Sequence, residues 1–194
     1  MSSITVKIGS GATPRGGRKV YKTSGKYALI RSQNIFDDKF DYNGLVYIDE
    51  KHANELNNVT LHENDILLNI TGASLGRVHI VPKEILPARV NQHVSIIRVN
   101  EKIDPYFLYA HFCLPKIKHY MLCHNAGGTR EALTKGMVKN WDQSRFGAQK
   151  IYPKIPVTLT GSGMPKHTFQ TIAYEIICRT VFTIISRFLS THDW

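Results

Sequence analysis

The feature that most constrains the fold is residues 65–81, DILLNITGASLGRVHIV, where two apolar runs flank a segment punctuated by glycine. Short apolar runs bounded by turn residues are typical of buried β-strands. Gly72 and Gly76 permit backbone angles or close approaches that other residues resist. The pattern therefore predicts two strands joined by a tight loop at residues 71–76.

Further β-rich runs flank this hairpin in the sequence. Residues 27–30 and 45–48 predict two short strands, and the alternating residues 94–99 predict another. Residues 8–26 are crowded with Gly, Pro, Ser and Lys, which predicts an irregular loop.

A helix start is visible in the second half of the chain. Asp104 followed by Pro105 predicts a helix start, because aspartate caps free amides and proline fits the first helical position. This helix should run to about residue 121 or 122, and residues 133–138 should begin another short element.

The chain changes character after Trp141. Residues 142–167 are rich in Pro, Gly and Ser without clear periodicity, which predicts a linker. Residues 168–194 then carry apolar side chains at helical spacing, which predicts an amphipathic helix. That stripe fits either a partner interface or a packed core helix, and the linker before it favours the interface. The interface candidates are Phe169, Ile172, Ile176, Ile177, Val181, Ile184, Ile185 and Phe188.

Positive charge is concentrated at the N-terminal end. The chain has 25 Lys and Arg against 15 Asp and Glu, a formal charge of +10, and no acidic residue precedes Asp37. A segment of one sign indicates a surface that faces phosphates. A solvated basic tail is the alternative.

Two stretches resemble motifs of enzymes, but each lacks a residue that the motif requires. The stretch GATPRGGRK places glycines at phosphate-loop spacing, but Gly17 stands where the phosphate-binding lysine belongs. Asp104 to Phe107 resembles the base-gripping motif of aminomethyltransferases without its second proline, and helix capping explains it better. We therefore expect a protein that is not an enzyme.

Metal and export signals are also missing from the sequence. His119, Cys123 and His124 lie close together, yet no second ligand pair at zinc-site spacing accompanies them, so no metal is expected. Three cysteines without CxxC spacing suggest reduced thiols. With no signal-peptide-like or membrane-spanning run, the expected location is the cytoplasm.

Three stretches carry a family resemblance: DILLNITGASLGRVHIV from Asp65, VNQHVSIIRV from Val90 and GGTREALTK from Gly127. In this order they resemble the specificity subunits of type I restriction-modification systems. The Thr13–Pro14 pair and the segment SQNI at 32–35 fit the same pattern. The resemblance covers about residues 8–141.

The resemblance implies that residues 1–141 form an α/β (α+β) target-recognition domain like those of other DNA methyltransferases, with a twisted β-sheet and short helices. A full subunit has two such domains, separated by long helices that bind modification (methyltransferase) subunits. S-adenosylmethionine and ATP are used on partner subunits, so no cofactor is expected on this chain. Here there is one domain, and the family's PLPP segment is missing after Trp141.

Residue chemistry and the resemblance together give the expected DNA contacts. Arg, Lys, Asn and Gln side chains suit base edges, although most contacts in such interfaces go to phosphates. At the glycine loop, phosphate binding and a purely structural turn are equally favoured. For Asn91, Gln92 and His93, a role as polar loop staples is favoured over DNA contact. The expected DNA-binding residues are Arg15, Arg18, Lys19, Lys22, Arg31, Gln33, Asn34, Thr71, Ser74, Arg77, Arg130 and Lys135.

These observations lead to two hypotheses. In the first, the chain recognises one half-site of double-stranded DNA for a type I methyltransferase or endonuclease complex, with a homodimer through the C-terminal helix as one arrangement. In the second, it is a truncated remnant that binds partner subunits or a second copy and no longer recognises DNA.

Overall fold

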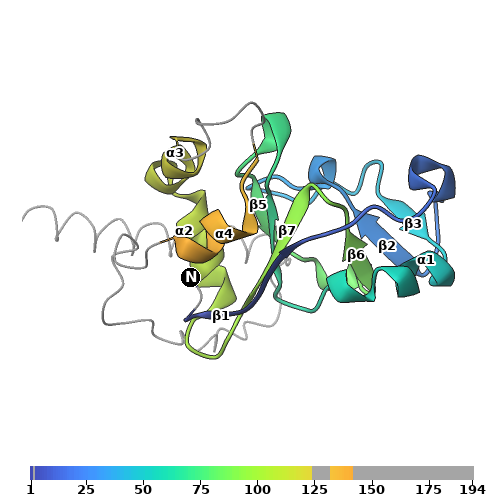
Figure 1. Cartoon of the computed structure of the whole chain (residues 1–194), viewed down its shortest axis with the longest axis horizontal. Coiled ribbons are helices and arrows are strands. Elements are labelled where there is room, and N and C mark those ends of the chain that lie inside the picture. The colour runs from blue at the N-terminus through green and yellow to red at the C-terminus, as the bar shows by residue number, and fades with distance from the viewer. Residues whose placement is uncertain (2, 124–131, 142–194) are drawn as a thin grey trace, which may run out of the picture. The chain divides into compact units, whose positions relative to one another are not determined.

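The larger sheet of the protein has four antiparallel strands in the order β1-β7-β4-β5. They appear in a computed structural model that describes residues 1, 3–123 and 132–141 (Figure 1). The strands are β1 (Thr5–Ser10), β4 (Ile66–Asn69), β5 (Val78–Ile80) and β7 (Val94–Val99). The predicted hairpin at 65–81 and the predicted strand at 94–99 are confirmed.

The edge strand β1 was not predicted, and it corrects the loop expected over residues 8–26. Residues 8–10 belong to β1, although the rest of that range contains no strand. The register shifts between Thr5 and Lys7, and Val6 is 66% exposed, whereas Ile8 is buried. A bulge of this kind breaks the alternation on which strand prediction depends.

The smaller sheet has three strands in the order β3-β2-β6. The predicted strands are confirmed as β2 (Tyr27–Ile30) and β3 (Val46–Ile48), which are antiparallel, whereas β6 (Ala88–Val90) is parallel to β2. β6 escaped prediction because it has three residues and its centre is a buried arginine, Arg89, which is 4% exposed.

Four α-helices accompany the sheets in the part of the chain that the structure describes: α1 (Glu50–Glu55), α2 (Pro105–Cys113), α3 (Pro115–Cys123) and α4 (Lys135–Asn140). The predicted cap is confirmed, since the Asp104 carboxylate accepts from the amides of Tyr106 and Phe107. The single helix expected from 105 to about 122 is wrong. Leu114 is extended at ψ 133°, because the following Pro115 disfavours helical backbone at the residue before it.

Short 3-10 helices occupy the connections: η1 (Gly17–Val20), η2 (Ser32–Asn34), η3 (Asn57–Val59), η4 (Gly72–Ser74) and η5 (Lys83–Ile85). The expected linker at 142–167 and the expected C-terminal helix at 168–194 lie outside the described residues.

The larger sheet is buried on both faces. Ile66 and Leu68 of β4 pack with Phe112 of α2 in one core, and Leu67 packs with Leu29 of β2 in the other. Figure 1 shows the helices α2, α3 and α4 on one side of β7 and the smaller sheet with α1 on the other. Each such fully buried Leu or Ile contributes roughly 1.5–3 kcal/mol. The expected mixed α+β class is confirmed, as a helical layer, a four-stranded sheet and a smaller sheet.

Candidate nucleic-acid interface

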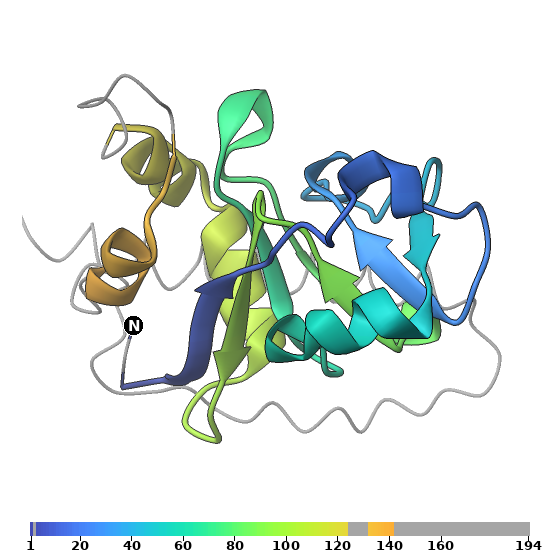
Figure 2. The same ribbon diagram turned by 45° about the vertical axis from the view of Figure 1, so that its right-hand side comes forward.

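Strands of both sheets end at one edge of the domain. We call it the loop edge, and it comprises residues 11–20, 31–45, 70–77 and 91–93. Backbone hydrogen bonds join its segments: Gly11 N to Val94 O at 2.9 Å, Asn91 N to Ile30 O at 3.0 Å, and Ile70 N to His93 O at 3.0 Å. The loop edge runs along the upper side of Figure 2. Segments that carry two of the family-like stretches therefore meet in space.

A chain of side-chain hydrogen bonds crosses the loop edge. Thr71 Oγ1 lies 2.7 Å from His93 Nδ1, and His93 Nε2 lies 3.0 Å from Gln92 Nε2. The Gln92 carbonyl oxygen accepts from the hydroxyl of Thr13. Asn91 Oδ1 accepts from the His93 amide at 3.1 Å. These residues therefore act as the polar staples expected of them, and they hold the N-terminal loop against the glycine loop.

The N-terminal loop presents the exposed side chains Arg15, Arg18 and Lys19. Two consecutive glycines, Gly16 at φ 92° and Gly17 at φ 57°, start η1 in backbone conformations that favour glycine. The turn that they form brings three cations together within five residues. Because no acidic residue precedes Asp37, their charge is not balanced locally.

The expected DNA contacts at η2 differ in how exposed their side chains are. Gln33 is exposed, whereas Arg31 is half-buried and donates from Nη2 to Gly44 O at 2.5 Å. Asn34 is 0% exposed, and its amide donates to Asp41 O at 2.9 Å. Asn34, one of the expected DNA-binding residues, is therefore buried, and its amide holds the following loop in place.

The glycine loop carries Thr71, Ser74 and Arg77, all partly exposed. Gly72 at φ 66° and Gly76 at φ 83° allow the loop to reverse within η4. Lys118 of α3 donates to the carbonyl oxygen of Gly76, so a helix from the far side of the sheet fixes the end of this loop. The turn geometry is thus established, while phosphate binding by Thr71 and Ser74 stays a prediction.

The third family-like stretch returns to the same place. Ala132 forms a β-bridge with Thr71, and Leu133 N donates to Ile70 O at 2.8 Å. Lys135 is exposed at the start of α4. Arg130 lies outside the described residues, as do all eight expected interface residues between 169 and 188.

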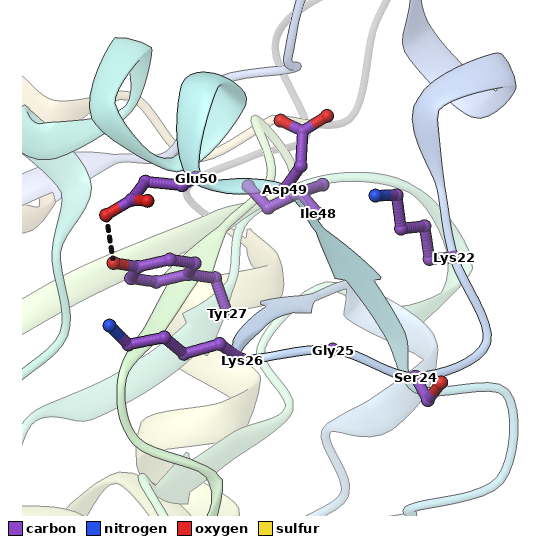
Figure 3. A pocket seen from close by; sticks show the side chains of 8 residues that line it. All are labelled: Lys22, Ser24, Gly25, Lys26, Tyr27, Ile48, Asp49 and Glu50. Atoms are coloured by element: carbon purple, nitrogen blue, oxygen red, sulfur yellow. Dashed lines mark hydrogen bonds between the residues drawn. The ribbon is translucent and has the colours of Figure 1, made fainter.

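Lys22 is separated from the other candidates. With Lys26 it lines a shallow hollow of about 260 Å³ beside the start of β2 and the end of β3, the ends opposite to the loop edge (Figure 3). In this hollow the Tyr27 hydroxyl donates to Glu50 at 3.3 Å, and the Lys26 ammonium lies 5.2 Å from the Tyr27 ring centre. The sequence could not show this separation, because Lys22 is only three positions after Lys19 along the chain.

Metal-ligating side chains do not gather within residues 1, 3–123 and 132–141, where no group of three His, Cys, Asp or Glu could hold an ion. His119 Nε2 and Cys123 Sγ lie 3.3 Å apart on α3. Among the described helices, none combines the length and hydropathy needed to cross a bilayer.

Sequence reasoning missed one contact that bears on function. The guanidinium of Arg77 lies 4.5 Å from the ring centre of Phe36, a residue that was not singled out. The two positions are separated by two strands, an α-helix and two 3-10 helices, and no periodic pattern in the sequence links them. The only sequence signal was the position of Phe36 directly after the segment SQNI.

Comparison with known proteins identifies a matching family and similar solved structures. The family model described as "Type I restriction modification DNA specificity domain" matches residues 6–142. No curated protein sequence matches the chain.

Two solved structures are similar at low sequence identity. One is described as "Structural basis underlying complex assembly and conformational transition of the type I R-M system", with 15% identity and a TM-score of 0.50. The match covers 72% of this chain and 31% of that one.

The other is the crystal structure of a type I restriction-modification S subunit from M. genitalium, with 14% identity and a TM-score of 0.48. It is covered to 30% of its length by 71% of this chain. The chain thus spans about a third of each solved relative. The family model matches the residues that form both sheets and the loop edge, and it ends one residue after Trp141. This chain belongs to the family of type I restriction-modification DNA specificity domains.

Proposed function

We propose that this chain recognises one half-site of a specific double-stranded DNA sequence on behalf of a type I restriction-modification complex. The observation that carries the proposal is the loop edge, where cationic and amide side chains from separate segments meet on one surface of a specificity domain. Cations supply affinity for phosphates, and planar polar side chains supply the contacts that distinguish bases.

Chemistry on DNA is assigned to partners rather than to this chain. Modification subunits would bind S-adenosylmethionine and transfer the methyl group, and ATP would be used by a further subunit. The apolar stretch at residues 168–194 would bind a modification subunit or a second copy of the chain. A second copy would supply a second recognition domain, which matters because this chain spans only 31% of the first solved relative.

A competition band-shift assay tests the function. The full chain is assembled with modification subunits and incubated with a labelled duplex selected from a random pool, at one stated salt concentration. We expect the selected duplex to compete about 10³-fold better than random duplex, the lower end for specific DNA-binding proteins. Equal competition by random duplex would contradict recognition and favour the alternative of a partner-binding remnant.

Charge removal at the loop edge gives a second prediction in the same assay. Replacing Arg15, Arg18 and Lys19 together by glutamine should weaken binding to every duplex. The plot of the logarithm of the association constant against log[salt] has a negative slope. The magnitude of this slope should fall by about 2–3, since each lost phosphate contact removes roughly 0.9. The measurement is the dissociation constant at four or more salt concentrations.

The matched control removes three exposed lysines outside the loop edge: Lys26, Lys51 and Lys102. We expect their replacement by glutamine to change the slope by less than about one unit. If both triple variants lose the same slope, total charge rather than the loop edge governs binding, and the assignment of the surface is wrong.

A further inference from the structure

The arginine side chains of the described residues differ in what occupies their hydrogen-bond donors. Arg98 forms two hydrogen bonds with the Asp65 carboxylate, at 2.7 and 2.8 Å. Arg89 is buried and donates to Ala53 O, Ala88 O and Asn57 Oδ1. Arg31 donates to the Gly44 carbonyl oxygen. Arg98 and Arg89 therefore have few donors left for a ligand, whereas Arg31 is held by one hydrogen bond and by the Tyr21 ring, 5.6 Å from its guanidinium carbon.

Arg77 combines a fixed position with free donors. Its guanidinium stacks over Phe36 at 4.5 Å from the ring centre, and it makes no side-chain hydrogen bond or ion pair with the described residues. Stacking on an aromatic face restrains the planar group without using its N–H donors. A restrained side chain loses less conformational entropy when it binds.

The aromatic platform is itself held firmly. Phe36 N donates to Lys39 O at 3.1 Å within a tight hairpin closed by the Ile35–Phe40 bridge. The adjacent Asp37 carboxylate accepts from the amide of Val78 at 2.9 Å and from the ammonium of Lys118 at 2.6 Å.

Asp37 thus anchors the hairpin to β5 and α3, and its charge is compensated by Lys118. The Phe36 ring is therefore placed by contacts with two other elements. It also carries a second cation, since Lys39 Nζ lies 5.5 Å from the ring centre.

We propose that Arg77 is a specificity-determining residue that recognises a guanine in the major groove, and that Phe36 is the positioning residue that aims it. This assignment rests on the proposed function. The planar fork of arginine matches the two adjacent acceptors of guanine, O6 and N7. Adenine presents a donor beside its acceptor, thymine presents a methyl group beside its acceptor, and cytosine presents only a donor. Arg77 is the last residue of the glycine loop, directly before β5, and its guanidinium lies at the loop edge against the ring of Phe36.

Selection of duplexes from a randomised pool tests the assignment, with the full chain assembled with modification subunits at fixed salt. We expect the sequence selected by the wild-type protein to contain a guanine whose replacement weakens binding about 10-fold or more. Arg77→Gln should lose that preference at one position, or exchange it for adenine, which glutamine matches in the same bidentate way. Phe36→Leu should weaken the same preference and leave the other positions unchanged.

Arg15→Gln is the matched control, because Arg15 is exposed at the loop edge without a stacking partner among the described residues. It should lower affinity for all duplexes equally and keep the selected sequence. Thermal melting of each variant shows whether the fold is retained. If Arg77→Gln does not fold, Arg77→Lys replaces it in the selection experiment, because lysine retains the charge.

Three results would overturn the assignment. If Arg77→Gln weakens all duplexes equally, Arg77 contacts phosphate. If Phe36→Leu leaves the base preference intact, the ring has no positioning role. If the DNA sequence selected by the wild-type protein requires no guanine, Arg77 does not recognise one, although the proposed function stands. A wild-type protein that selects no sequence at all would instead overturn the proposed function, and this assignment with it.

Discussion

Replacing Asp65 by alanine should lower the free energy of unfolding by about 3–5 kcal/mol, the cost of breaking a buried ion pair from one side. The Asp65 carboxylate is 0% exposed and binds the Arg98 guanidinium through both oxygens, at 2.7 and 2.8 Å. One of these oxygens also accepts from His62 N at 2.8 Å. Without the carboxylate, the Arg98 guanidinium, on a side chain only 21% exposed, keeps the hydrogen bond to the Thr60 carbonyl oxygen but no counter-charge at that position.

Urea unfolding followed by circular dichroism measures this loss. Glu63→Ala is the matched control, since the Glu63–Lys83 pair is only two positions away but 53% and 76% exposed, and exposed pairs contribute about 0–1 kcal/mol. Replacing both Asp65 and Arg98 by apolar residues should recover much of the stability, because no lone charge is left buried. Equal effects of Asp65→Ala and Glu63→Ala would show that burial does not strengthen the inner pair.

Acidification should destabilise the domain through His111, by about 3 kcal/mol between pH 6.5 and pH 4. Burial lowers the pKa of His111 from 6.5 to about 4, because the charged imidazolium loses its hydration in the interior. In this window the unfolded chain binds a proton that the folded chain does not, so stability falls as the pH falls. Above pH 6.5 both states are neutral at this residue, and the stabilising effect is fully present.

The measurement is the urea midpoint as a function of pH. His111→Gln should flatten the profile between pH 4 and 6.5, whatever its absolute stability. Burial lowers the pKa of His79 as well, so a smaller slope in the same direction should persist in His111→Gln. An identical slope in wild type and His111→Gln would contradict the assignment.

Much of the fold followed from local patterns. Strands β2, β3, β4, β5 and β7 were predictable, because each alternates or runs apolar between turn residues. Local patterns failed where another residue interrupted the signal. Pro115 divides the long helix in two, the register shift at Thr5–Lys7 disguises β1, and the charged Arg89 disguises β6.

The candidate site was predictable as a set of residue types but not as a surface. The exposed cations Arg15, Arg18 and Lys19 lie at the loop edge as expected. Asn34, of equally suitable chemistry, is buried, and Lys22 lies beside the hollow at the opposite strand ends. Exposure depends on what packs over a residue, and that is set by segments far away in the sequence.

The sequence by itself determined the glycine loop, the strands that flank it and the basic, acid-free N-terminal segment, because turns, alternation and charge are properties of neighbouring residues. Only the tertiary structure decided that the glycine loop meets the N-terminal loop through Thr13, Gln92 and His93. It also decided which arginines stabilise the fold, and that the guanidinium of Arg77 stacks on Phe36 while making no side-chain hydrogen bond with the described residues. The reason is physical: hydrogen bonds, stacking and burial join residues that the folded backbone brings together, and their spacing along the chain leaves no periodic trace.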